Sequence, residues 1–220
     1  MIQGAIFDFD GTLADSMYFW ENIGSIYLRS LGKEPGPEVL TAIQNMTLRR
    51  AAEYFHTTYG LSQTADEIVA AVNGMMEEQY FYHIQPKPGV IPFLEEMKAK
   101  GIPMCIATAT DRYLVDRALE RCGMKKYFSE VFTCSQIGHG KDRPDIFRAA
   151  LAHLGTEKAR TPVFDDAHHA VLTAKADGFP VVGIFDPYEH EPQIVRETAD
   201  LFLEQGLADR DAFWAFAEAL

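Results

Sequence analysis

The sequence predicts an α/β fold built on a doubly wound parallel sheet, with a helical domain inserted near the N-terminus. Short apolar runs recur along the chain, and amphipathic segments that end in glycine separate them. Residues 16–86 interrupt this alternation, because they show helical periodicity and no convincing strand. Strands that alternate with helices are typical of parallel sheets, since each crossover helix returns the chain to the start of the next strand.

The apolar runs outside the inserted region are short and bounded by turn residues, as buried strands are. We expect strands at Ile2–Asp8, Ile102–Thr108, Glu130–Thr133, Pro162–Asp166, Pro180–Phe185 and Asp200–Leu203. The helical segments among them, 88–101, 111–123 and 144–155, each end in glycine. The expected sheet is Rossmann-like, and its ligand site should lie beyond the carboxyl ends of the strands.

The inserted region shows helical periodicity at Tyr18–Leu31, Leu48–Tyr59 and Thr64–Tyr82. The last of these opens with a capping box formed by Thr64 and Glu67. The aromatic run Tyr18–Trp20 is interpreted as core of the insert rather than as a platform for a sugar. We therefore expect a catalytic core at residues 1–15 and 87–220 and a helical cap at 16–86, with a hinge at 85–89.

Composition narrows the classes of partner. The 220 residues include 20 Lys and Arg against 32 Asp and Glu, a net charge of −12, which disfavours nucleic acid because backbone binding needs clustered basic residues. No apolar run approaches the roughly 18 residues of a membrane span, and no basic leader precedes one. We expect a cytoplasmic protein with no membrane partner, monomeric by default. Cys105, Cys122 and Cys134 are interpreted as reduced core thiols.

Polar side chains follow three of the expected strands at the point where each ends. Asp8 and Asp10 follow the first, Thr108 closes the second, and Asp165 and Asp166 close the fourth. Because the carboxyl ends of parallel strands meet at one edge, four carboxylates would converge there and repel one another. Mg²⁺ prefers oxygen ligands and keeps waters that a phosphate can replace. The pattern favours a magnesium site that handles phosphate.

A family resemblance becomes visible in these residues. Residues 8–16 read D-F-D-G-T-L-A-D-S, and Thr108, Lys141 and the pair Asp165-Asp166 follow in that order. The chain thereby resembles the haloacid dehalogenase superfamily, in the helical-cap branch that includes β-phosphoglucomutase, phosphoglycolate phosphatase and many small-metabolite phosphatases. The resemblance covers nearly the whole chain. It implies phosphoryl transfer to and from an aspartate with Mg²⁺ as cofactor, on a small phosphorylated metabolite.

The resemblance also implies roles for the acidic residues. Asp8 would attack phosphorus and form an aspartyl-phosphate intermediate. Asp10 would protonate the leaving alcohol and then activate water, while its backbone carbonyl contributes to the metal. The implied metal ligands are Asp8, Asp10 and Asp166, with Asp165 as a second or water-mediated contact. The presence of Asp10 disfavours cleavage of carbon–halogen bonds, because a halide leaving group needs no acid.

The substrate-binding residues that the resemblance implies are Thr108, the backbone N–H of Ala109, Lys141 and Arg49. Lys141 would offset the charge of the phosphate as a compact cation. Arg49 lies where the β-phosphoglucomutase branch places a phosphate-binding arginine on its cap, although a solvated helix face is an equal alternative. The chain departs from the family pattern at Asp142, Ala167 and Ala170, where the pattern has Pro, Ser and Gly. These departures affect loop geometry and remove no charged group.

Three functions remain open on this reading. Hydrolysis is favoured over a phosphomutase, which would pass the phosphoryl group to a sugar hydroxyl, because Gln44-Asn45-Met46-Thr47 precede Arg49 where the mutase has a Gly-x-x-Arg region. A catalytically silent binding protein on the same fold is the third possibility. Such a protein would be free to lose Asp8 or Asp10, and both are present.

Overall fold

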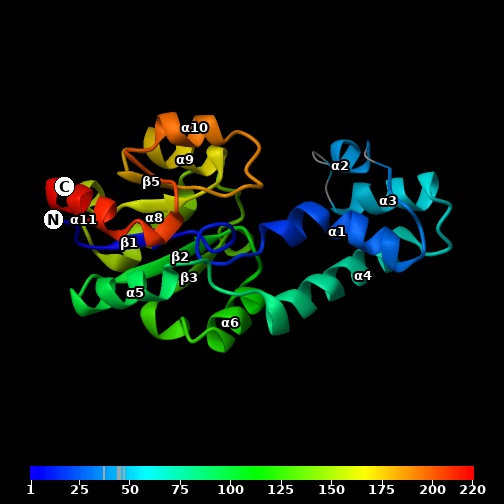
Figure 1. Ribbon diagram of the computed structural model, residues 1–220, viewed down its shortest axis with the longest axis horizontal. Helices are drawn as coiled ribbons and strands as arrows, with labels where there is room; N and C mark the ends of the chain where they lie inside the picture. Colours follow the sequence, from blue (N-terminus) through cyan, green and yellow to red (C-terminus); the bar gives the residue numbers. More distant parts are fainter. Residues whose placement is uncertain (37, 44–45, 47) are drawn as a thin grey trace. The chain divides into compact units, whose positions relative to one another are not determined.

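A parallel sheet forms the centre of the larger part of the chain (Figure 1). The computed structural model describes residues 1–36, 38–43, 46 and 48–220. Within them the sheet has six strands in the order β3-β2-β1-β4-β5-β6, and each neighbouring pair is parallel. The strands are β1 Ala5–Phe7, β2 Met104–Thr108, β3 Val131–Thr133, β4 Val163–Asp165, β5 Val181–Ile184 and β6 Leu201–Leu203. The predicted doubly wound α/β fold is confirmed.

Each predicted strand is present but shorter than its apolar run. The run Ile2–Asp8 pairs with both neighbours only within β1, where Ala5 lies opposite Met104 and Phe7 opposite Phe164. Ile2 lies outside the strand and is nevertheless buried. Apolar character marks burial, which extends past the residues whose backbone joins the ladder.

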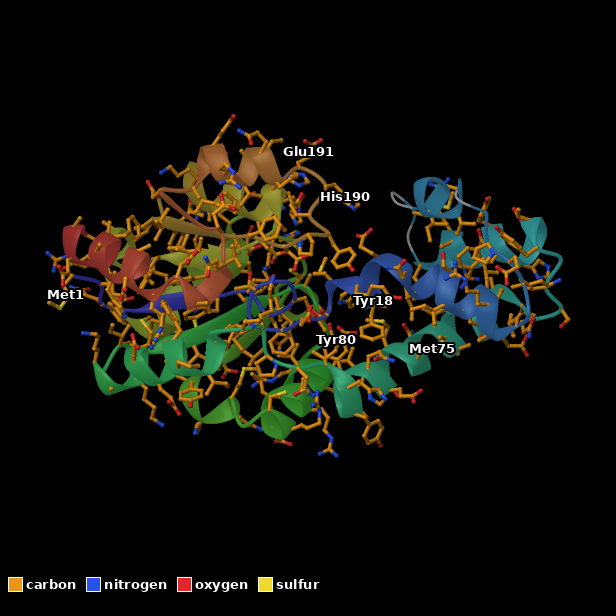
Figure 2. All side chains as sticks on the ribbon, viewed as in Figure 1. Met1, Tyr18, Met75, Tyr80, His190 and Glu191 are labelled. Carbon is orange, nitrogen blue, oxygen red and sulfur yellow. The ribbon has the colours of Figure 1, made fainter. Side chains whose placement is uncertain are left out.

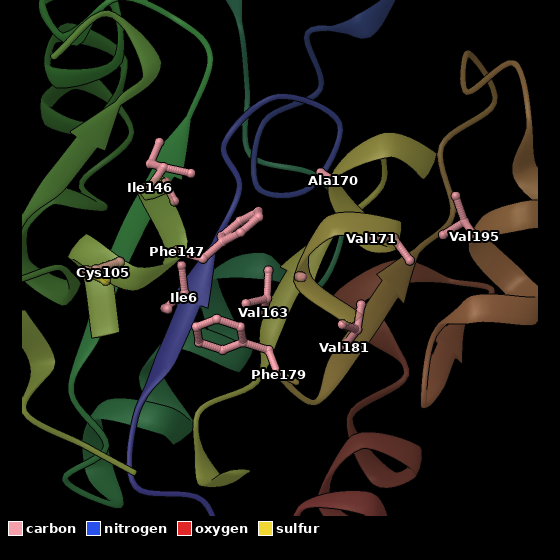
Figure 3. Packing of buried hydrophobic residues seen from close by; sticks show 13 residues of the cluster. Ile6, Cys105, Ile146, Phe147, Val163, Ala170, Val171, Phe179, Val181 and Val195 are labelled. Atoms are coloured by element: carbon pink, nitrogen blue, oxygen red, sulfur yellow. The ribbon is translucent and has the colours of Figure 1, made fainter. Parts of the chain in front are cut away.

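Helices cover both faces of the sheet. Successive side chains of a strand point to opposite sides, so the sheet packs against helices on both faces. Ile6 belongs to a buried cluster with Phe147 of α8, Val171 of α9 and Val195 of α10 (Figure 3). Phe7 faces the other way. The helices of this part are α5 Val90–Ala99, α6 Arg112–Arg121, α7 Cys134–Ile137, α8 Asp145–Leu154, α9 His168–Ala176, α10 Pro192–Thr198 and α11 Arg210–Ala219, with short 3₁₀ turns at Lys125–Tyr127, Lys158–Arg160 and Gly206–Ala208.

Aromatic rings fill the face to which Phe7 points. Phe7 stacks on Phe164 with ring centroids 4.3 Å apart, and Phe93 of α5 meets both rings edge-on. Phe213 of α11 packs against Phe93 and Phe164. Full burial of one such ring stabilises the fold by about 1.5–3 kcal/mol. These rings hold β1 and β4 in place, and the acidic residues follow directly from those two strands.

The chain divides into two compact units. The sheet unit comprises Met1–Ser16 and Ile84–Leu220, and the helical unit comprises Met17–His83. Elements of the helical unit are α1 Met17–Ser30, α2 Glu38–Ile43, α3 Leu48–Thr58, α4 Ala65–Glu78 and a π-helical turn at Gln79–His83. The short helix α2 was not predicted. Gln44, Asn45 and Thr47, which the comparison with mutases used, lie outside the described residues.

The predicted capping box at the start of α4 is confirmed. The Glu67 backbone donates to Thr64 Oγ1, and Glu67 Oε2 accepts from the Thr64 backbone N–H at 2.8 Å. These two bonds satisfy donors that a helix start otherwise leaves unpaired. The Thr64 backbone N–H and then the Thr64 hydroxyl, which both donate to the Glu67 carboxylate, lower the pKa of Glu67.

The interpretation of Tyr18–Trp20 as core is wrong for Tyr18 and Trp20, and Phe19 is only half-buried. Tyr18 is 48% exposed and Trp20 40% exposed, although Trp20 Nε1 donates to the Tyr80 hydroxyl at 2.9 Å (Figure 2 labels Tyr18 and Tyr80). The buried cluster of the helical unit takes Tyr27 and Leu28 from α1. The aromatic run occupies the first turn of that helix, away from the cluster.

The cysteines are free, but only Cys105 is buried in the core, while Cys122 and Cys134 are half-buried. Cys105 belongs to the core cluster and Cys134 packs against it, so the prediction of core thiols holds fully for Cys105 and in part for Cys134. Burial raises the pKa of the Cys122 and Cys134 thiols. In the part of the chain that the structure describes, no helix has both the length and the apolar character of a membrane span.

Candidate active site

The acidic residues lie where the winding of the sheet reverses. Strand β1 lies between β2 and β4, and the chain runs outward to β3 on one side and to β6 on the other. Loops that leave the carboxyl ends of β1 and β4 therefore diverge and leave a crevice, which is the usual ligand site of such sheets. Asp8 follows β1 directly, and Asp165 ends β4.

Three buried carboxylates gather at this point. Asp8, Asp165 and Asp166 each place one oxygen so that the three oxygens lie within 4.8 Å of one another. The backbone N–H of Asp8 donates to the Phe164 carbonyl at 2.8 Å, which fixes the first carboxylate against the strand that carries the other two. The sheet register thus brings together residues that are more than 150 positions apart in the sequence.

Lys141 provides the positive charge at this cluster. Its Nζ lies 2.5 Å from Asp8 Oδ1 and 2.8 Å from Asp165 Oδ2, and its side chain is almost fully buried. The residue comes from the loop between α7 and α8. A buried lysine with two carboxylate partners is held as a charged group rather than as a flexible surface side chain.

The charges of the cluster do not balance. Three carboxylates face one ammonium, so two negative charges would stay uncompensated if all were ionised. Burial is the largest cause that raises the pKa of Asp8 to about 8; Lys141 opposes the shift, and Asp165 and Asp10 add to it. The pKa of Asp166 is also raised, first by burial and then by Asp8. For Lys141, burial alone would lower the pKa, but Asp165 and Asp8 outweigh it and raise the pKa.

This donor set fits Mg²⁺. The cluster offers hard carboxylate oxygens at one point, and the charge that it lacks equals that of one divalent cation. The resemblance implied Asp8 and Asp166 as metal ligands and Asp165 as a second or water-mediated contact, and these are the three carboxylates that the structure brings together. The resemblance also assigned Asp10 to the metal through its backbone carbonyl, and that assignment stays a prediction.

A tight turn holds Asp166 in place. Thr12 Oγ1 donates to Asp166 Oδ1 at 2.9 Å, and both residues are buried. Gly11 adopts φ +76°, and a Cβ at this position would lie 2.2 Å from Asp166 Oδ2. The turn therefore requires glycine both for its left-handed backbone and for the close approach of the carboxylate.

Asp10 lies outside this cluster and has different partners. The Ser16 hydroxyl donates to Asp10 Oδ1 at 2.6 Å, and the Thr110 hydroxyl donates to Oδ2 at 2.7 Å. Asp10 is half-buried, whereas Asp8 is buried. The two carboxylates of the D-x-D motif are thus separated into a charged, lysine-bound group and a hydroxyl-bound group that solvent can reach.

Thr108 and Ala109 lie at the end of β2, beside β1. Thr108 is buried and its Oγ1 accepts from the Thr110 backbone N–H at 3.1 Å, which leaves its own hydroxyl hydrogen to donate. Ala109 is exposed. The assignment of both to substrate binding stays a prediction.

Arg49 belongs to the helical unit, in α3. Its guanidinium pairs with Asp66 at 2.6 Å and Glu53 at 3.5 Å, and its side chain is 63% exposed. Exposed pairs of this kind contribute little to stability and exchange readily with solvent. The role of Arg49 in substrate binding likewise stays a prediction.

Known proteins resemble this chain in sequence and in fold. The family model of the haloacid dehalogenase-like hydrolases matches residues 5–184. The chain belongs to this family. It is 24% identical over 177 residues to the phosphorylated carbohydrates phosphatase of Thermotoga maritima, covering 80% of this chain and 82% of that protein. It is 28% identical over 196 residues to (DL)-glycerol-3-phosphatase 2 of Arabidopsis thaliana, covering 84% and 80%.

A solved structure agrees in fold over the full length. The crystal structure of a provisionally assigned β-phosphoglucomutase from Thermotoga maritima superposes with a TM-score of 0.84 at 21% identity, and the match covers 100% of both chains. At this identity the likeness shows the fold. The family match shows that the chain is a haloacid dehalogenase-like hydrolase, as the resemblance implied.

Sequence reasoning gave no role to several side chains that hold the site of this hydrolase. Thr12 and Ser16 lie within the D-x-D-G-T-L-x-D-S motif, so their spacing was visible, but their partners were not. Thr110 is separated from Asp10 by 100 positions, and only the pairing of β1 with β2 brings them together. Lys87 was interpreted as part of a hinge, and no pattern in the sequence distinguishes it.

Proposed function

We propose that this hydrolase is a Mg²⁺-dependent phosphatase that acts on small phosphorylated metabolites through an aspartyl-phosphate intermediate. The observation that carries the proposal is the contrast between Asp8 and Asp10. Asp8 is buried beside Lys141 and two further carboxylates, whereas Asp10 is half-buried and held by hydroxyl groups. Such a separation supports two roles, a nucleophile and an acid–base group, for two aspartates two positions apart.

In the first step an oxygen of Asp8 attacks phosphorus and the bond between phosphorus and the ester oxygen breaks. Lys141 fixes Asp8 Oδ1, and the Thr108 hydroxyl is available to donate to the phosphoryl oxygens. Asp10, in its protonated form, gives its proton to the departing alkoxide. Ser16 and Thr110 hold the Asp10 carboxyl in one orientation, so the proton is delivered from a fixed position.

In the second step Asp10, now ionised, takes a proton from water, and the resulting hydroxide attacks the phosphorus of the aspartyl phosphate. The bond to Asp8 breaks, which releases inorganic phosphate and restores the carboxylate. Asp8, Asp166 and the backbone carbonyl of Asp10 would hold Mg²⁺, with Asp165 as an additional contact. When bound, the ion supplies charge that offsets the phosphoryl oxygens and the carboxylates.

The proposed substrate class follows from the role of Asp10 as a general acid. A group that donates a proton is useful when the leaving group is a poor one, such as the alkoxide of a sugar or polyol. Relatives named for phosphorylated carbohydrates and for glycerol 3-phosphate support the same class. We therefore propose a phosphorylated sugar or polyol of low molecular mass as substrate.

A panel of phosphomonoesters tests the proposal. The purified protein is assayed for phosphate release from glycerol 3-phosphate, hexose phosphates and p-nitrophenyl phosphate, with Mg²⁺ and with EDTA, beside Asp8→Asn as the matched inactive variant. Release that requires both Mg²⁺ and Asp8 supports a phosphatase. Isomerisation of a hexose phosphate that depends on an added sugar bisphosphate would show a mutase instead, and no turnover of any kind would indicate a binding protein.

A further inference from the structure

Lys87 connects three loops of the sheet unit through one ammonium group. Its Nζ donates to the Gly11 carbonyl at 2.6 Å, to the Phe185 carbonyl at 3.0 Å and to Asp186 Oδ2 at 2.8 Å. Three acceptors match the three N–H donors of a lysine side chain. The side chain of Lys87 is 14% exposed and that of Asp186 is 2% exposed, so this pair is largely removed from water.

The backbone around Lys87 is fixed to the same loop. The Lys87 N–H donates to the Leu13 carbonyl, and the Asp15 N–H donates to the Gln85 carbonyl, both at 2.9 Å. Residues 85–87 thus run beside residues 13–15, and the segment interpreted as a hinge is bonded in place at this point. The ammonium of Lys87 adds a third connection, to the turn at Gly11.

The turn that Lys87 holds is the one that contacts Asp166. Gly11 lies so close to the Asp166 carboxylate that no Cβ fits between them, and Thr12 donates to Asp166 Oδ1. A shift of the turn would therefore move Asp166 or lose its hydrogen bond. Lys87 therefore acts on Asp166 indirectly. Its ammonium group donates to the Gly11 carbonyl, and the Gly11–Thr12 turn contacts the Asp166 carboxylate.

Lys87 also neutralises an additional carboxylate near the cluster. Burial is the main cause of the raised pKa of Asp166, and Asp186 adds to the shift whereas Lys87 opposes it. Asp186 follows β5, the neighbour of β4, so its charge would otherwise add to that of the three clustered carboxylates. Because Lys87 pairs with Asp186, the Asp186 carboxylate does not add an uncompensated negative charge that would repel the clustered carboxylates.

We propose that Lys87 is a positioning residue, which fixes Asp166 for metal binding through the Gly11–Thr12 turn, with Asp186 as its counter-charge. The inference rests on the proposed function, in which Asp8 and Asp166 hold Mg²⁺. In the proposed function Lys87 is neither a metal ligand nor a substrate-binding residue. Its loss should therefore weaken metal binding more than it slows the turnover of the metal-saturated enzyme.

The test measures Mn²⁺ binding by the loss of the free-ion signal in electron paramagnetic resonance, with no substrate present. Mn²⁺ is a suitable probe because it shares the preference of Mg²⁺ for carboxylate oxygens. Removal of Lys87 alone would leave the buried Asp186 carboxylate without a counter-charge and could unfold the protein. The informative pair is therefore Asp186→Asn and Lys87→Met/Asp186→Asn, which differ only at Lys87. Lys98→Met removes an exposed lysine of α5 and serves as the control.

Residues that do not bind the metal but orient one of its ligands typically contribute about 10–100-fold to metal affinity. We expect Mn²⁺ affinity to fall by about tenfold between Asp186→Asn and the double variant, and to be unchanged in Lys98→Met. The Mg²⁺ concentration for half-maximal turnover should rise by a similar factor, with kcat at saturating Mg²⁺ reduced less.

Equal Mn²⁺ affinity in Asp186→Asn and the double variant would overturn the inference and leave the proposed function intact. A reduced kcat at saturating Mg²⁺ with unchanged affinity would also overturn it. Absence of Mn²⁺ binding by the wild-type protein would overturn the metal site of the proposed function itself, and the role of Lys87 with it.

Discussion

Replacement of Gly11 by alanine would place a methyl group where the Asp166 carboxylate lies. A Cβ at position 11 comes within 2.2 Å of Asp166 Oδ2, whereas ordinary contact begins at 3.4 Å. The difference of 1.2 Å must be absorbed by movement of the carboxylate or of the turn. Gly11 also has φ +76°, a conformation that costs an L-residue about 1–2 kcal/mol.

Gly101→Ala provides the matched control. Gly101 has φ +71°, and a Cβ there meets nothing within 4 Å. Both variants incur the cost of a left-handed backbone at alanine. Alanine also makes the unfolded chain stiffer than glycine does, which offsets about 0.4–1 kcal/mol of this cost. The free energy of unfolding of each variant should therefore fall by about 1 kcal/mol from the backbone alone. Only Gly11→Ala displaces Asp166. A misplacement of about 1 Å can reduce turnover roughly 10²-fold, and the loss of metal affinity should be about 10–100-fold.

Urea unfolding in EDTA measures the stability of the two variants without a metal contribution. Mn²⁺ titration and Mg²⁺-dependent phosphate release then measure the site. Gly101→Ala should resemble the wild type in both site assays, and Gly11→Ala should be impaired in both. A folded Gly11→Ala protein with wild-type Mn²⁺ affinity and turnover would refute the reasoning that the turn positions Asp166.

Three further predictions test other parts of the account. Asp10→Asn should slow formation of the phosphoenzyme by about 10²–10⁴-fold for alkyl phosphates and much less for p-nitrophenyl phosphate in single-turnover experiments, because nitrophenolate hardly needs a proton; equal slowing would exclude the acid role. EDTA should abolish turnover of p-nitrophenyl phosphate and Mg²⁺ should restore it, whereas activity that persists in EDTA would contradict the metal assignment. Arg148, and then Lys158, lower the pKa of Asp177 in the folded protein. The ionised Asp177 therefore stabilises the fold fully above its unfolded pKa, and this stabilisation is lost as the pH falls through its folded pKa. Asp177→Asn should show a smaller drop in urea midpoint between about pH 5 and pH 2 than the wild type, and an equal drop would disprove this role of Asp177.

The sequence predicted the sheet well because parallel strands buried on both faces are short apolar runs between glycine-ended helices. It predicted strand ends poorly, as at Ile2, because apolar residues can be buried outside the ladder. The short helix α2 was missed, since one and a half turns give little periodicity to detect. The exposure of Tyr18 and Trp20 was also missed, because residue type does not reveal which turn of α1 reaches the core of the helical unit.

The candidate site could be predicted as far as its motif extends. Asp8, Asp165 and Asp166 were expected at one edge of the sheet, and the structure brings them together there. Lys141 was implied by the resemblance as a substrate-binding residue, and it lies against Asp8 and Asp165. Lys87 could not be found, because a single lysine between two prolines has no periodicity, spacing or motif. Its importance arises from three acceptors on loops up to 99 positions away, which only the folded chain places around one ammonium.

The central claim is that Asp8 becomes phosphorylated during turnover. Acid quenching of the enzyme with Mg²⁺ and a phosphomonoester within milliseconds, followed by mass spectrometry of its peptides, tests this most directly. The account predicts a phosphoryl adduct on the peptide that contains Asp8, formed at a rate that can support turnover and absent in Asp8→Asn. Steady phosphate release with no adduct on Asp8, or with an adduct on another residue, would contradict it.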